Sequence, residues 1–160
     1  MKKKPLLLLA VAVVAALVLT RLWTHDSDDA ADPALVFNRV WIDQLPRDAK
    51  QTFNTFIAAT EQPIGIFHTG SQWKGGYEVF GHKLKGDQLR IVYLQENQTE
   101  TVKVRAWPCG EKGMDYCLEL TGASRGVKRY RSMQGWEIDG AATRPEQLLD
   151  RVASVVRAAN

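Results

Sequence analysis

From residue 64 to residue 133, apolar and polar side chains alternate in short runs, the pattern of half-buried β-strands. In the run 101–107, for example, Val102, Val104 and Ala106 share one face, and charged or bulky residues occupy the other. Turn-forming residues separate the runs by gaps short enough to favour antiparallel hairpins. The pattern therefore predicts about six to eight antiparallel strands, arranged as a strongly curved sheet or a small barrel.

The hydrophobic period changes on the N-terminal side of these runs. Residues 34–42 read as a first strand, whereas Phe53, Phe56 and Ile57 in the segment 46–60 follow helical spacing. We therefore predict one helix over Pro46–Thr60, ending before Pro63.

The last eighteen residues predict a second helix. Thr143 and Glu146 have the spacing of a capping box, in which each side chain bonds the other residue's backbone N–H. An apolar stripe beginning at Leu148 follows at helical spacing and requires a surface to pack against. The fold class is thus α+β: mainly an antiparallel β meander, with one helix before it and one C-terminal helix.

The chain begins with a targeting segment, residues 1–24. Lys2, Lys3 and Lys4 precede fourteen consecutive apolar residues that run from Leu6 to Leu19. This pattern fits either an uncleaved membrane anchor or a cleaved signal peptide, and both place the rest of the chain outside the cytoplasm. Residues 25–34 form an acidic, flexible tether, and residues 35–160 form a single extracytoplasmic domain.

The distribution of charge along the chain bears on the partners and location that we predict. The net charge of the whole chain is +3, but its basic excess flanks the apolar segment and leaves residues 25–160 nearly neutral. A nearly neutral domain lacks the field that non-specific nucleic-acid binding requires, so no nucleic-acid partner is expected. We predict a location in the cell envelope, facing outward from the inner or plasma membrane, or secretion if the signal is cleaved.

The two cysteines, Cys109 and Cys117, are predicted to form a disulfide. An oxidising compartment favours the bond, and seven intervening residues match neither redox nor zinc-binding motifs. Both sulfurs would project from the same side of a hairpin, as a cross-strand bridge requires.

Two sets of residues are candidates for binding. A candidate basic face could contact an envelope protein, anionic lipid or glycan, and three aromatic residues are candidate contacts. The basic set is Lys103, Arg105, Arg125, Lys128, Arg129 and Arg131, and the aromatic set is Trp73, Trp107 and Tyr130.

No motif in the sequence indicates catalysis. The Gly-x-Ser-x-Gly elbow of serine hydrolases is missing, and His68 and His82 show no spacing typical of metal ligands. We expect no catalytic residue, metal or cofactor.

The predicted hairpins from Ile64 to Met133, followed by a C-terminal helix, resemble the lipocalin, or calycin, plan. The Gly-x-Trp motif near that family's first strand is similar to Gly70-Ser71-Gln72-Trp73, which has one residue more. The resemblance implies export and a barrel whose mouth admits a small apolar ligand.

Three functions follow as expectations. The first is a non-enzymatic cell-envelope protein that acts by binding a partner or surface component. The second is a protein that binds a small apolar or lipid-like ligand inside a barrel, and the third is an enzyme of unrecognised type. The sequence leaves the oligomeric state open.

Overall fold

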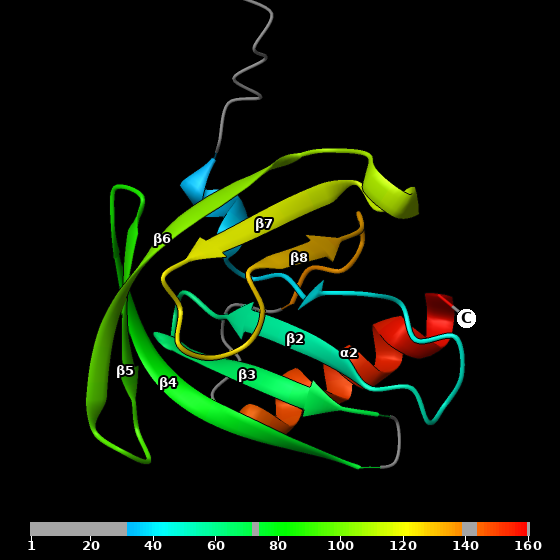
Figure 1. The fold of residues 1–160 in the computed structure, drawn as a ribbon, viewed down its shortest axis with the longest axis horizontal. Coiled ribbons are helices and arrows are strands. Elements are labelled where there is room, and N and C mark those ends of the chain that lie inside the picture. Colours follow the sequence, from blue (N-terminus) through cyan, green and yellow to red (C-terminus); the bar gives the residue numbers. More distant parts are fainter. Residues whose placement is uncertain (1–31, 72–73, 139–143, 160) are drawn as a thin grey trace, which may run out of the picture. The chain divides into compact units, whose positions relative to one another are not determined.

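The computed structural model describes residues 32–71, 74–138 and 144–159 of the chain. Within them, eight antiparallel strands form a closed barrel, because each strand pairs with its neighbours in sequence and β1 also pairs with β8 (Figure 1). The prediction of an antiparallel meander is confirmed, and the sheet closes. The elements in order are η1 (Pro33–Val36), β1 (Trp41–Ile42), β2 (Phe53–Ala58), β3 (Ile64–Gly70), β4 (Gly75–Lys85), β5 (Gln88–Tyr93), β6 (Gln98–Pro108), η2 (Glu111–Gly113), β7 (Tyr116–Thr121), β8 (Arg129–Ser132) and α2 (Pro145–Ala159).

Aromatic side chains pack closely inside the barrel. The ring centroid of Phe67 lies 5.3 Å from that of Phe56 and 5.0 Å from that of Phe80. Tyr130 is fully buried in the same core, with its ring 6.1 Å from that of Phe56. Rings at these separations attract each other beyond the effect of their buried area.

Chain segments outside the strands cover both ends of the barrel. At one end, η1 contributes Val36 to the interior core, and the indole N–H of Trp41 donates to the Val36 carbonyl oxygen. At the other end, the loop 122–128 between β7 and β8 folds inward, and the Val127 N–H donates to the Tyr130 hydroxyl.

The helix α2 packs on the outside of the barrel. Its buried side chains Leu148, Val152, Val155 and Val156 form a second core with the outward-facing residues of β1, β2 and β3. The predicted C-terminal helix and its apolar stripe are therefore confirmed. Thr143 of the predicted capping box lies outside the described residues.

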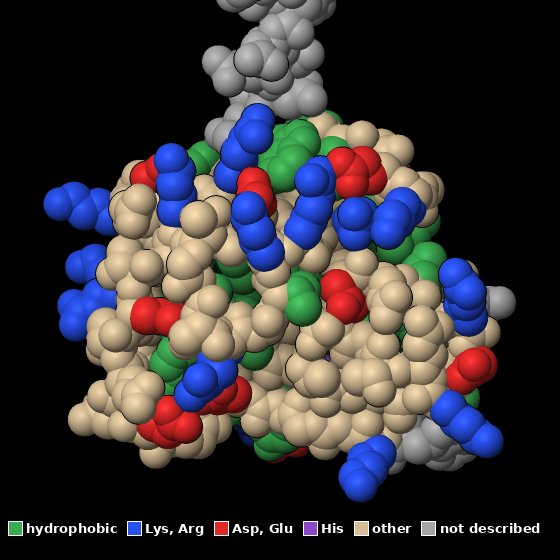
Figure 2. Space-filling view, in the orientation of Figure 1, with side chains coloured by type: hydrophobic (Ala, Val, Ile, Leu, Met, Phe, Trp, Pro, Cys, Tyr) green, Lys and Arg blue, Asp and Glu red, His purple; other side chains and the backbone are tan. Residues whose placement is uncertain are grey.

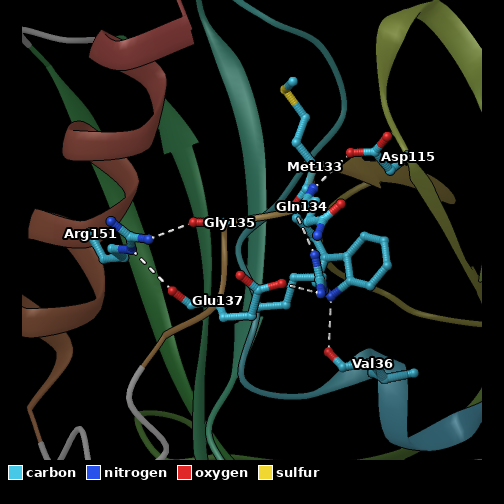
Figure 3. Close-up of polar contacts among 9 residues, drawn as sticks. Val36, Asp115, Met133, Gln134, Gly135, Glu137 and Arg151 are labelled. Carbon is cyan, nitrogen blue, oxygen red and sulfur yellow. Dashed lines mark hydrogen bonds and ion pairs between the residues drawn. The ribbon is translucent and has the colours of Figure 1, made fainter.

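Hydrogen bonds hold α2 to the segment that follows β8. The Arg151 guanidinium donates to the carbonyl oxygens of Gly135 and Glu137, and the Gln134 N–H donates to Asp115 (Figure 3). The Arg39 guanidinium, which is almost fully buried, adds an ion pair of 2.5 Å to Glu137. The Arg151 bonds thus join α2 to this segment, and the Gln134 and Glu137 contacts join the segment to the rest of the barrel.

The prediction of a helix over Pro46–Thr60 is wrong. Its last part is β2, and residues 46–52 form a connection without a helix. Both faces of β2 are buried, because Phe56 points into the barrel while Phe53 and Ile57 lie under α2. A strand buried on both faces loses its alternation, and its apolar residues then match helical spacing by chance.

The strand predicted over residues 34–42 is present only in part. Its first half forms η1, whose cap is the Asp32 carboxylate accepting from the Ala34 N–H, and its last two residues form β1. The end of the predicted tether is thus part of the folded unit. The predicted targeting segment and residues 25–31 lie outside the described residues, and within the described part no helix has the length and apolarity to cross a membrane.

Candidate functional site

The cysteine pair closes the hairpin between β6 and β7, as predicted. Cys109 and Cys117 are disulfide-bonded, with a Cα–Cα distance of 5.7 Å. The Glu111 carboxylate lies near both sulfurs, an arrangement that could suggest a metal site. Because both sulfurs belong to the disulfide, neither is a thiolate that could coordinate a metal.

Five cations lie together on the outward-facing side of β4, β5 and β6. Strand pairing places Lys83 opposite Arg90, and Lys85 in one row with Gln88 and Lys103. Lys103 pairs with Asp87 at 3.4 Å, whereas the other cations have no carboxylate partner among the described residues. We call this set the basic outer face; it consists of Lys83, Lys85, Arg90, Lys103 and Arg105.

The remaining predicted cations on β8 and beside it are neutralised by acidic neighbours. Lys128 pairs with Glu119, while Arg129 and Arg131 share the Glu111 carboxylate. Figure 2 shows the alternation, with acidic side chains between the Lys and Arg side chains over β6 and β7. Lys103 and Arg105 of the predicted set thus belong to the basic outer face, and sequence reasoning missed Lys83, Lys85 and Arg90.

Arg125 lies elsewhere, at the end of the barrel that the loop 122–128 covers. Its guanidinium bridges Glu78 at 2.8 Å and Glu96 at 2.9 Å, and it stacks over the Tyr93 ring. The Tyr93 hydroxyl donates to Glu100, and burial together with this hydrogen bond raises the pKa of the Tyr93 hydroxyl. This network holds the loop 122–128 in place.

Of the predicted aromatic residues, Trp107 and Tyr130 lie on opposite sides of the barrel wall. Trp107 lies on the outer side of β6 as predicted, but the guanidinium groups of Arg105 and Arg129 cover its ring at 4.6 and 5.4 Å. The Trp107 side chain is 9% exposed, so its indole ring packs against these two guanidinium groups and has little surface left for a partner. Tyr130 is buried in the barrel interior, and Trp73 lies outside the described residues.

A groove of about 550 Å³ runs between α2 and the outer side of β3 and β4. We call it the α2 groove. Phe53 and His68 line its barrel side, and Leu149 and Ala153 line its helix side. Lys74, at the turn before β4, and Arg157, near the end of α2, add two cations to the lining. Its size and mixed lining are typical of small-molecule sites.

Two glycines shape the floor of the α2 groove. Gly70 and Gly75 face each other across β3 and β4. A Cβ atom would come within 2.8 Å of the His68 Nε2 atom at Gly70, and within 2.6 Å of it at Gly75. Side chains at either position would therefore displace the imidazole ring, so the glycine pair leaves the space that the ring occupies.

His68 is the polar centre of this floor. Burial lowers the pKa of its imidazole, which is therefore neutral at pH 7. Its Nδ1 atom and the hydroxyl of the cross-strand neighbour Thr55 are buried, and neither has a hydrogen-bond partner within the described ranges. By contrast, His82 stacks on Phe37 and its Nε2 atom bonds the Ala59 carbonyl oxygen at 2.9 Å.

The described part of the chain is therefore a closed eight-stranded antiparallel barrel with a basic outer face and a groove beneath its C-terminal helix. No family model matches the chain, and no curated protein or solved structure is significantly similar to it.

Proposed function

We propose that the protein is a non-enzymatic component of the cell envelope whose basic outer face binds the headgroups of anionic lipids. The observation that carries this proposal is a contiguous set of five exposed cations on β4, β5 and β6, for which the described residues supply one carboxylate partner, Asp87. Residues 25–160 are nearly neutral as a whole, so the local excess of positive charge is a feature of this face.

Electrostatic attraction to an anionic membrane surface contributes roughly 1 kcal/mol for each nearby Lys or Arg. Four of the cations form no ion pair within the part of the chain that the structure describes, and they are the main source of this attraction: Lys83, Lys85, Arg90 and Arg105. An uncleaved N-terminal anchor, one of the two forms predicted for the targeting segment, would keep such a surface close to lipid, which favours lipid headgroups over a soluble partner.

A lysine-labelling experiment on the full chain tests the proposal. The chain is placed in nanodiscs of phosphatidylcholine alone, or with phosphatidylglycerol added, and acetylation of Lys85 and Lys103 is followed by mass spectrometry. Both side chains are exposed, and Lys50, on the connection before β2, is the internal reference. We expect selective protection of Lys85 and Lys103 in anionic discs, which high salt removes because it screens exposed charges.

Charge reversal supplies the matched comparison. The double substitution Lys83→Glu and Arg90→Glu should weaken the contact by roughly 2 kcal/mol or more, about thirtyfold, and abolish the protection. Arg47→Glu with Arg144→Glu reverses two other exposed cations and should leave it intact. Equal acetylation in the two disc compositions would contradict the proposal.

The second candidate is a small apolar ligand inside the barrel, as the resemblance to the lipocalin plan implies. The closed barrel with an external helix is compatible with that plan. Close packing of Phe56, Phe67 and Phe80 in the interior gives this candidate less support than the basic outer face.

A further inference from the structure

We propose that the α2 groove binds a single-chain amphiphile with a carboxylate headgroup. The inference concerns a different surface from the basic outer face and does not depend on the function proposed for it. It follows from three features of the groove: its apolar walls, the cations in its lining and the His68 ring at its floor.

The walls of the groove suit a hydrocarbon chain. Phe53 contributes an aromatic surface from β2, and Leu149, Val152 and Val156 contribute aliphatic surface from α2. The volume of about 550 Å³ lies within the ordinary range for sites that enclose a small ligand. Burying a methylene group there would contribute through the hydrophobic effect.

The lining cations select the charge of the headgroup. Lys74 and Arg157 are both exposed, and neither side chain has an ion-pair partner among the described residues. They belong to opposite walls, because Lys74 precedes β4 and Arg157 is in the last turn of α2. A carboxylate between them would gain charge-assisted hydrogen bonds from both sides.

The His68 ring supports the same ligand. A neutral imidazole places a polar but uncharged surface in the groove, so an amphiphile meets no buried charge that would have to be desolvated. Gly70 and Gly75 leave room for the ring at this position, and Tyr77, 45% exposed, continues the lining along β4.

Photo-crosslinking tests the proposal on the full chain in phosphatidylcholine nanodiscs. The probe is dodecanoate with a diazirine on its alkyl chain, and peptide mapping by mass spectrometry locates the adducts. We expect adducts on α2 and on β3 and β4, which unlabelled dodecanoate suppresses. A diazirine probe with the same chain and a trimethylammonium head should give at least fivefold fewer adducts there.

Two variants separate the groove from general hydrophobic labelling. Ala153 is exposed and lines the groove, so Ala153→Trp should fill it and reduce adduct yield at least fivefold. Its neighbour Ser154 is exposed and does not line the groove, so Ser154→Trp is the matched control and should retain the adducts. Lys74→Gln with Arg157→Gln should remove the preference for the carboxylate probe.

The proposal would be overturned by equal labelling with the anionic and cationic probes, or by adducts that persist in Ala153→Trp. Either result would leave the acetylation of Lys85 and Lys103 unaffected, because those residues lie outside the groove. Failure of this inference can therefore be distinguished from failure of the proposed function.

Discussion

At the scale of single residues, Gly126 shows how one position allows the loop 122–128 to cover its end of the barrel. Its φ is +71°, and an added Cβ atom would lie 2.1 Å from the Tyr130 hydroxyl and 2.8 Å from the Phe67 ring. The loop 122–128 therefore approaches the interior core more closely than any side chain at this position allows.

We predict that Gly126→Ala lowers the free energy of unfolding by about 3 kcal/mol, since positive φ and overpacking both penalise the methyl group. Gly86→Ala is the matched control, because Gly86 has φ +62° but nothing within 4 Å of its Cβ position. That change should cost about 1 kcal/mol. Urea unfolding of the two variants measures the difference, and equal losses would contradict the close approach.

Residue-level reasoning from the sequence predicted the disulfide and two members of the basic outer face, Lys103 and Arg105, but not the other three. Cys109 and Cys117 were predictable because the two flanking runs alternate clearly. The basic outer face was not, because Lys83 and Arg90 meet Lys103 and Arg105 only through pairing across three strands. Acidic partners from other elements, such as Glu111, could not be predicted from the sequence either.

At the scale of elements, the sequence revealed those with one buried face. The strands β5 and β6 have a solvated side and alternate, and α2 has a single apolar stripe. In contrast, β1 and β2 are buried by the interior on one side and by the second core on the other. Their patterns carried no period of two, so β2 was mistaken for a helix.

The disulfide hairpin gives an element-scale prediction. Replacing both Cys109 and Cys117 with alanine should lower the free energy of unfolding by roughly 2–3 kcal/mol, because the unfolded chain gains the freedom of a short open loop. Denaturation of the variant measures this loss, and wild-type protein unfolded in reductant serves as the reference. If the reduced wild type were as stable as the oxidised form, the hairpin would not depend on the bond.

At the scale of the whole molecule, two histidines link stability to pH. Burial lowers the pKa of both His68 and His82 below the ordinary value of 6.5. The unfolded chain therefore binds protons more readily than the folded chain in this range. The free energy of unfolding should be highest above about pH 6.5, where both histidines are neutral in the folded and unfolded chain. It should fall as the pH drops below that value.

Thermal unfolding at pH 7.5 and pH 5.5 measures this dependence. We expect a lower melting temperature at pH 5.5, and a smaller difference between the two pH values in a variant carrying His68→Gln and His82→Gln. His25, which precedes the barrel domain, provides a control because His25→Gln should leave the difference unchanged. An identical pH response in the double variant would assign the effect to other groups.

The pairing of β1 with β8 has a consequence for how the molecule comes apart. Every other neighbouring pair of strands is joined over longer runs than this one, where β1 contributes two residues and meets β8 at the Ile42–Arg131 pair. This seam is thus the shortest stretch of strand pairing in the described barrel, and hydrogen bonds of residues 38–40 with residues 136–138 extend it. If β1 and β8 separated, each would expose an edge with unpaired backbone N–H and C=O groups. A second copy of the chain could pair with these edges, which is a direct route to domain-swapped assemblies.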